Sequence, residues 1–366
     1  MNASKERQAL KDRDLSFDSS DVPSEEIWEA FQNKHGGRLS GLSPKRCRHI
    51  ALRYCQVVEQ KTKIWMEKLE KDHQIDAYSL HWTALPLRYD STSIRASHLG
   101  GHMLNTASYL GFAPSTLTAV NELTLSMDKE KLTTARARAF LDRFNLLVQS
   151  RNDPDVFTLK GRLLQIQNQP SAALTYFDKA IEAARNLTPA DPSQPSAPGS
   201  GPDSPSKPII TIRKPRWSLE ASCHFGRGVA LIELHRGQEA YRSFHVAAWE
   251  LNHMPSLYMV ARFLDPKAPP PVPQMRASAL LAAAQAGHWP SARYLSELLS
   301  KRAEDPGVPA EERASAREMA QEWALVAPPK DTNEKKEAKS QGWVRLIPVG
   351  MVGKEKPKKP AQSKGR

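Results

Sequence analysis

The apolar residues of this chain recur at the spacing of α-helices. From Pro154 onward the pattern predicts two helices joined by a turn, each with one apolar face. A proline at the first helical position and an Asn-Gln-Pro turn at 168–170 mark the boundaries. The residues of the two faces are Phe157, Gly161 and Leu164 in the first helix, and Ala173, Phe177 and Ala180 in the second.

This pattern occurs a second time. Gly161, Ala173, Phe177 and Ala180 recur as Gly228, Ala240, Phe244 and Ala247, in each case 67 residues later. Each copy places a glycine where two helices must touch. A helix pair of this kind cannot bury its stripe alone, so neighbouring pairs must stack to form a shared core. The sequence therefore predicts an array of helix pairs, which offers a curved surface for a partner rather than a catalytic pocket.

A second repeated motif extends the array. The segment 252–256 (Asn-His-Met-Pro-Ser) is echoed 35 residues later by 287–291 (Gly-His-Trp-Pro-Ser), and more weakly by 111–115. Glycine ends a helix in the left-handed region, and proline in the first turn of the next helix costs no hydrogen bond. The predicted starts of the helix pairs are Pro154, Ala221, Pro255 and Pro290, with final intervals of 34 and 35 residues.

These residues resemble the tetratricopeptide repeat. The second copy departs from the family at His224, where the family has an aromatic or aliphatic residue. The segment 282–288 is similar to the alanine-rich Gly-His turn of the related Sel1-like repeats. The resemblance implies an all-α fold, a right-handed α-solenoid of antiparallel helix pairs whose concave face binds a protein segment.

The resemblance also assigns residues to that concave face. The first helix of each pair lines it, and the matching positions are Thr158, Arg162 and Gln165 in the first copy, and Phe225, Val229 and Ile232 in the second. Only Arg162 fits the family's clamp for terminal carboxylates, so an acidic chaperone tail is a poor ligand. An apolar strip beside one arginine suits an amphipathic helix or an extended apolar segment. The alternative is that the protein's own N-terminal helices cover Phe225 and Val229.

The rest of the chain divides by composition. Residues 1–20 are expected to be disordered, 21–110 to form helices packed on the array, 111–186 and 216–300 to be helical repeats, 301–327 a capping helix and 328–366 a basic disordered tail. Further helices are expected over 24–35, 44–71, 93–109, 114–126, 131–149 and 309–325. Pro86 interrupts an apolar run, so 75–90 is expected to be irregular.

A Pro/Ser-rich segment, 187–215, separates the two copies of the repeat. It has almost no apolar residues before Ile209, and such a composition cannot offset the entropy lost on ordering. We therefore expect a disordered insertion that loops out between neighbouring repeats. A linker between two separate domains is the alternative.

The net charge of +12 is concentrated at the C-terminal end, where residues 330–366 carry 11 basic and 4 acidic side chains. Such a tail would be attracted to RNA, ribosome or lipid, so the rival function is an RNA- or ribosome-associated helical-repeat protein. The change from Thr158 and Arg162 to Phe225 and Val229 argues against base-by-base reading. The apolar island 343–349, which begins with Trp343, is either an accident of the tail or a segment that docks on the array.

No window holds 18 consecutive apolar residues, so no membrane span is expected. The mixed charges of the first twenty residues disfavour a secretory signal and weaken a mitochondrial presequence. Cys47, Cys55 and Cys223 form no disulfide framework, which favours a reducing compartment. We expect a soluble intracellular protein of the mitochondrial matrix or, as the alternative, of the cytoplasm.

Catalytic motifs are weak. His98 and His102 have a metal-compatible spacing but lack the glutamate of a metalloprotease, and Gly226-Arg227-Gly228 lacks the third glycine of a dinucleotide loop. The chain carries no phosphate-loop signature and no Gly-x-Ser-x-Gly elbow. The sequence therefore favours a non-enzymatic scaffold, adaptor or assembly factor, with no metal and no cofactor.

Overall fold

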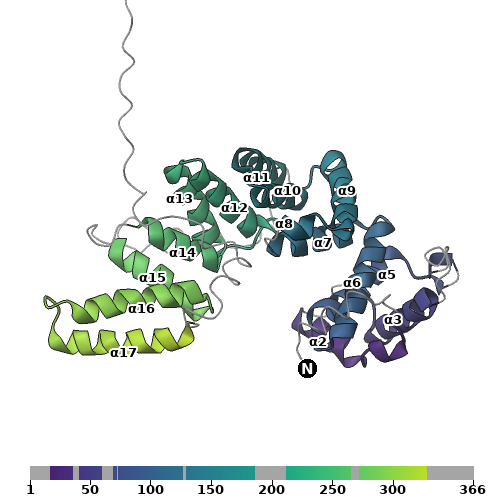
Figure 1. Ribbon diagram of the computed structural model, residues 1–366, viewed down its shortest axis with the longest axis horizontal. Helices are drawn as coiled ribbons and strands as arrows, with labels where there is room; N and C mark the ends of the chain where they lie inside the picture. The colour runs from purple at the N-terminus through teal and green to yellow at the C-terminus, as the bar shows by residue number, and fades with distance from the viewer. Residues whose placement is uncertain are drawn as a thin grey trace, which may run out of the picture. The chain divides into compact units, whose positions relative to one another are not determined.

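The structure is a computed structural model that describes residues 17–35, 41–59, 69–71, 73–126, 129–185, 212–264 and 272–327. Every regular element in these ranges is a helix, which confirms the predicted all-α class (Figure 1). The chain forms two compact units, residues 1–123 with 132–150, and residues 124–131 with 151–366. Several predictions concern residues outside these ranges. They are the disorder of residues 1–16, of most of the insertion and of the tail, and the role of the island at 343–349.

The first unit is built on a core of large buried side chains, among them Trp28, Tyr54 and Phe17. Because Phe17 is buried and a short helix begins two residues later, the disordered N-terminus that was predicted to reach residue 20 ends earlier. The elements are η1 (Ser19–Asp21), α2 (Glu26–Lys34), α3 (Pro44–Glu59), α5 (Ala77–Tyr89), α6 (Ile94–Tyr109), α7 (Ala113–Leu125) and α9 (Ala135–Ser150), where the end of α7 belongs to the second unit.

The prediction of an irregular segment over 75–90 is wrong, because α5 runs through it. Asp76 caps the helix by accepting a hydrogen bond from the Ser79 amide, and Pro86 lies in the last turn of α5. A proline there loses one hydrogen bond without ending the helix, since few residues follow it. Its own carbonyl accepts the Asp90 amide at 3.0 Å, which closes the helix.

Helix α6 packs on α5 at very short range through Gly100. A methyl group on Gly100 would lie 2.7 Å from the Arg88 backbone nitrogen and 2.8 Å from the Ala84 carbonyl oxygen. Only glycine allows this approach of two helix backbones.

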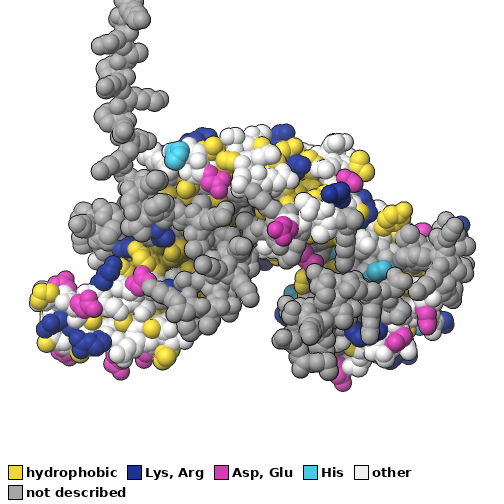
Figure 2. Space-filling view, in the orientation of Figure 1, with side chains coloured by type: hydrophobic (Ala, Val, Ile, Leu, Met, Phe, Trp, Pro, Cys, Tyr) yellow, Lys and Arg dark blue, Asp and Glu magenta, His cyan; other side chains and the backbone are white. Residues whose placement is uncertain are grey.

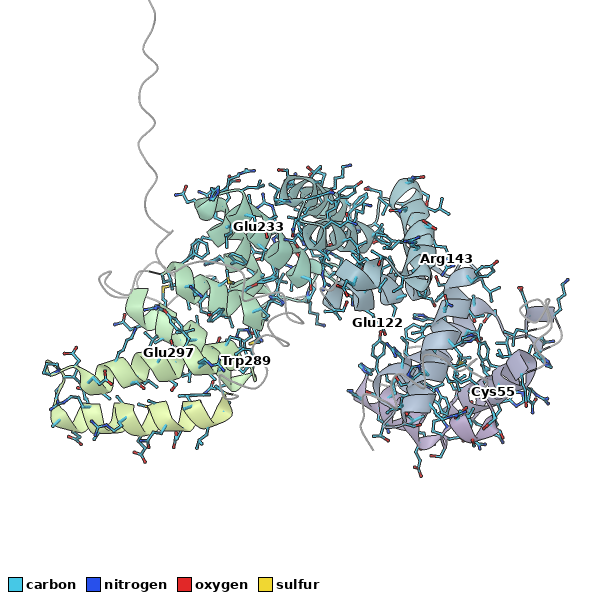
Figure 3. All side chains as sticks on the ribbon, in the orientation of Figure 1. Cys55, Glu122, Arg143, Glu233, Trp289 and Glu297 are labelled. Carbon is cyan, nitrogen blue, oxygen red and sulfur yellow. The ribbon has the colours of Figure 1, made fainter. Side chains whose placement is uncertain are left out.

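Helix α9 belongs to the first unit, although the sequence grouped residues 111–186 with the repeats. Arg143 lies on α9 (Figure 3). Its Nε donates to Ser108 Oγ on α6 at 3.0 Å, and its guanidinium lies over the rings of Tyr109 and Phe140. The helix predicted over 131–149 is divided, since α8 (Lys129–Leu132) ends before α9 and Thr134 caps the start of α9. The predicted packing of 21–110 on the repeats concerns both units and stays a prediction.

The second unit contains helices that pack on their neighbours in chain order. Four of them begin within one residue of the predicted starts of the helix pairs, which are Pro154, Ala221, Pro255 and Pro290. In addition to α8, the elements are α10 (Pro154–Ile166), α11 (Pro170–Arg185), α12 (Glu220–Glu233), α13 (Gly237–His245), the π-helical turn η2 (Val246–Glu250), α14 (Met254–Phe263), α15 (Val272–Gln285), α16 (Trp289–Glu304) and α17 (Ala310–Val326).

The close contacts within this unit follow the repeated glycines. The ring of Phe177 on α11 lies so close to Gly161 on α10 that a methyl group there would come within 2.7 Å of the ring. The same ring meets Gly226 on α12, where a methyl group would lie 2.5 Å from Cζ. Phe177 thus fills a slot between one helix pair and the next. Phe244 on α13 repeats the first contact against Gly228 on α12.

The turns have the expected chemistry. Asn168, Asn252, Gly111 and Gly287 all have positive φ, which places the ends of their preceding helices in the left-handed region. In both copies of the His-x-Pro-Ser motif the histidine precedes the first residue of a helix. Nδ1 of His253 lies 2.9 Å from Ser256 Oγ, and the same pair at His288 and Ser291 lies 2.8 Å apart.

The insertion ends earlier than predicted. Residues 212–215 are among the described residues, and Arg213 anchors them to α12 and η2. Its guanidinium donates to both oxygens of Glu220 at 2.9 and 2.8 Å and to Glu250 at 2.9 Å. Glu220 is buried, which acts to raise its pKa, but hydrogen bonds from Arg213 and from the Arg216 amide hold that pKa below the ordinary value.

At the far end α17 packs along α16, as the predicted capping helix would (Figure 1). Ala316 and Ala320 are buried in this contact, whereas Leu325 is 88% exposed. The predicted boundary at 300–301 falls inside α16, which continues to Glu304.

We predict that Gly226→Ala destabilises the second unit by about 2 kcal/mol. The added methyl group would overlap the Phe177 ring, and the ring cannot move away because its other side lies against Gly161. The matched control is Gly237→Ala, where the nearest side-chain atom is 3.9 Å from the new methyl group. Urea unfolding followed by circular dichroism should show the control unchanged or slightly more stable, since alanine favours helix. Equal effects from both substitutions would contradict the close contact.

Candidate functional site

The six residues that the resemblance assigned to the concave face lie on α10 and α12, but they are not equally accessible. Thr158 is completely buried, and its hydroxyl donates to the Pro154 carbonyl at 2.7 Å. A ligand cannot reach it, so its assignment to the binding surface is wrong. Its small side chain and local hydrogen bond suit the contact between α10 and α12 instead.

The other two residues on α10 are half-buried. The amide Nε2 of Gln165 donates to the Gly226 carbonyl at 2.8 Å, so this side chain ties α10 to α12. Burial lowers the pKa of Arg162 to about 10, which still leaves its guanidinium charged at neutral pH. Gln165 therefore has a structural role, and Arg162 is a half-buried cation on the same helix.

The three residues on α12 form an apolar strip, which we define as Phe225, Val229 and Ile232. All three are half-buried and pack on the core of the second unit. The Phe225 ring lies 5.6 Å from the Phe244 ring and 5.4 Å from the His253 ring, measured between centroids. The strip therefore packs on the core of the second unit, and only its outer edge is accessible.

His253 adds a group that the sequence did not assign to the site. Burial, and then the nearby His288 and Arg162, lower the pKa of His253 to about 4, so the ring is neutral at pH 7. Arg162 from α10, Phe225 from α12 and His253 from the start of α14 thus meet at one place. The sequence signal for His253 is the repeated His-x-Pro-Ser motif, which by itself predicts only a turn.

An aromatic row continues from this place toward α16. The Tyr258 ring lies 5.4 Å from the His288 ring and 6.2 Å from the Tyr294 ring. Arg276 on α15 is buried over the Tyr294 ring, and its Nε donates to the Ala261 carbonyl at 3.1 Å. These contacts hold α14, α15 and α16 together.

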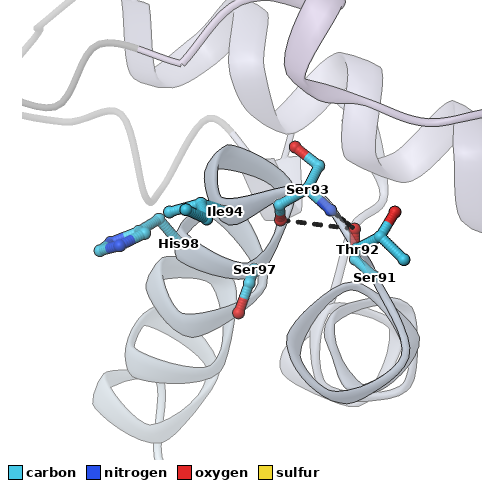
Figure 4. A pocket seen from close by; sticks show the side chains of 6 residues that line it. All are labelled: Ser91, Thr92, Ser93, Ile94, Ser97 and His98. Carbon is cyan, nitrogen blue, oxygen red and sulfur yellow. Dashed lines mark hydrogen bonds between the residues drawn. The ribbon is translucent and has the colours of Figure 1, made fainter. Parts of the chain in front are cut away.

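His98 and His102, whose spacing is compatible with a metal, have different surroundings. His102 Nδ1 lies 2.6 Å from the Tyr54 hydroxyl inside the first unit. His98 lines a small hollow at the start of α6 together with Ser91, Thr92, Ser93, Ile94 and Ser97 (Figure 4). Ser97 donates to the Arg88 carbonyl at 3.1 Å, and Ser93 caps α6. No group of three potential metal ligands occurs among the described residues.

The cysteines and the helix lengths agree with the sequence as far as the structure reaches. Cys47, Cys55 and Cys223 are all free and buried. Burial raises the pKa of Cys55 and of Cys223 to about 12, which makes these thiols poor nucleophiles. Among the described residues, each helix is too short or too polar to cross a lipid bilayer.

Comparison with family models, with curated proteins and with solved structures finds no match to this chain. The likeness to tetratricopeptide repeats therefore rests on the residues of the two copies. A fold does not by itself indicate a function, so the chemistry of the surface decides. That surface is apolar on α12 and cationic beside it.

We predict that His224→Phe stabilises the second unit and flattens the pH dependence of its stability. His224 is 8% exposed, and its Nε2 is buried with no hydrogen-bond partner among the described residues. Burial is the main cause that lowers the pKa of His224 to about 4, so between pH 6.5 and 4 the unfolded form binds more protons. The native protein should lose about 1.4 kcal/mol per pH unit through this residue as the pH falls across that range.

Urea unfolding at pH 7 and pH 5 would measure this effect. The variant should be more stable at pH 7, because an unsatisfied buried nitrogen costs about 1 kcal/mol or more, and its stability should change less between the two pH values. A variant with the same pH slope as the native protein would show that His224 is not held neutral by burial.

Proposed function

We propose that this chain is a non-enzymatic scaffold or adaptor, of the kind used in the assembly of other proteins. In this proposal the second unit is a right-handed solenoid of tetratricopeptide-like helix pairs. Its first helices carry a binding face that takes one segment of a partner protein. The support is the repeated glycine–phenylalanine contact, which occurs at Gly161–Phe177 and again at Gly228–Phe244.

The observation that carries the proposal is the composition of the face that α10 and α12 share. The strip of Phe225, Val229 and Ile232 is apolar but half-buried, and Arg162 lies beside it. Apolar residues scattered singly are ordinary on a protein surface, whereas Phe225, Val229 and Ile232 follow one another along one side of α12. An apolar strip with a cation at its edge matches the anatomy of protein–protein interfaces, which combine an apolar centre with a polar rim.

The partner segment is then an amphipathic helix or an extended chain with apolar side chains. Its apolar residues would pack on the strip, and its backbone would run along the first helices of the pairs. The visible face over α10 to α13 mixes hydrophobic side chains with basic and acidic ones (Figure 2). A surface of both charges is better suited to a protein than to a polyanion such as RNA.

We predict that Phe225→Asp abolishes capture of the partner by the purified full chain. A carboxylate in the centre of the strip cannot be desolvated by an apolar ligand. Ile232→Asp is a second variant, which avoids the Phe225–Phe244 contact and so guards against a folding defect. The matched control is Leu325→Asp, since Leu325 is an apolar residue that is 88% exposed on α17.

The measurement is quantitative mass spectrometry of proteins captured from lysate, with and without nuclease. The proposal expects proteins that are captured by the native chain and by Leu325→Asp, survive nuclease and are lost with both strip variants. Proteins that vanish on nuclease treatment, or capture that the strip variants leave unchanged, would contradict it. The circular dichroism of each variant reports whether it is folded.

A further inference from the structure

The two ends of the apolar strip differ in charge. At the Phe225 end, Arg162 and His253 come from the neighbouring helices α10 and α14. Nδ1 of His253 lies 2.9 Å from Ser256 Oγ, and in the tautomer in which Nδ1 accepts the serine hydroxyl, Nε2 carries the proton and can donate to a ligand. A cationic guanidinium and such an imidazole N–H together suit a carboxylate.

The opposite end of the strip carries Glu233. This residue lies four positions after Val229 and eight after Phe225, so it shares their side of α12 about 12 Å along the helix axis. Glu233 is exposed, and no hydrogen bond or ion pair joins it to another residue of the described chain. The nearby Arg236 is engaged by Glu239, with two contacts of 2.7 Å.

The position of Glu233 is electrostatically unfavourable in the protein by itself. It is the last residue of α12, where the helix dipole already places partial negative charge. A carboxylate there does not stabilise the helix and has no salt-bridge partner among the described residues, but a cationic side chain of a ligand would neutralise it. Such an arrangement is understandable if the residue serves recognition.

We propose that the face binds a protein segment whose side chains run acidic, apolar and basic from the Phe225 end of α12 to the Glu233 end. The acidic side chain accepts hydrogen bonds from Arg162 and His253. Apolar side chains lie on Phe225 and Val229, and the basic side chain pairs with Glu233. This inference rests on the proposed function, because it concerns the same face.

The charges at the two ends of the strip disfavour two other kinds of ligand, a nucleic acid and a purely apolar segment. A nucleic acid would bring phosphates to Glu233 as well as to Arg162, and like charges there disfavour it. A purely apolar segment would offer no cation to Glu233 and would remove the Arg162 guanidinium further from water, which costs free energy. At neutral pH the positive charge at the first end comes from Arg162, because burial lowers the pKa of His253 and of His288 to about 4 and leaves both rings neutral.

The test is selection of a phage-displayed library of random twelve-residue peptides on the immobilised full chain. Parallel selections use Glu233→Lys, Arg162→Gln combined with His253→Gln, and Phe225→Asp. The matched control is Glu318→Lys, a charge reversal at an exposed carboxylate on α17. The native chain and this control should enrich the same peptides, with an acidic residue at one end of an apolar stretch and a basic residue at the other.

The variants should change that consensus separately. With Glu233→Lys the basic residue should be replaced by an acidic one, and recovery of the original peptides should fall about fivefold. With the Arg162 and His253 substitutions the acidic preference should disappear. Apolar peptides without charge order, still lost with Phe225→Asp, would overturn this inference and leave the binding face intact. Peptides that bind Phe225→Asp as well as the native chain would overturn the binding face itself.

Discussion

The second unit depends on one aromatic ring held between two glycines. Phe177 lies against Gly161 within its own helix pair and against Gly226 in the next pair, and neither contact leaves room for a methyl group. The ring is completely buried, so its hydrophobic stabilisation and the close approach of α10, α11 and α12 come from the same atoms. This contact sets the distance between the pair α10–α11 and the pair α12–α13, and therefore the spacing of Arg162 and Phe225.

The candidate site inherits its geometry from that spacing. Gln165 reaches across from α10 to the Gly226 carbonyl, and Phe225, the residue next to Gly226, is thereby fixed beside Arg162 and the start of α14. Three helices contribute one side chain each, so the chemistry at the Phe225 end exists only when successive pairs are in contact. The apolar strip and the charges at its ends follow from the stacking of the helices.

Sequence reasoning predicted the helix class and the starts of the helix pairs because periodicity and Gly/Pro chemistry act locally. It failed at α5, because Pro86 lies in the last turn of the helix, where the lost hydrogen bond does not end it. It also misjudged Thr158, because a repeat position gives the direction of a side chain but not its burial. His253 was missed because its neighbours, Arg162 and Phe225, are far from it in the sequence.

The most direct measurement of the central contact is the NMR chemical shift of the glycine α-protons. Because the Phe177 ring lies where a side chain would start on Gly161 and on Gly226, one α-proton of each should be displaced by the ring current. Phe177→Leu should return both signals toward ordinary glycine values while the spectrum stays that of a folded protein. Ordinary shifts for both glycines in the native chain would show that the ring does not lie between the helix pairs, and would contradict the account.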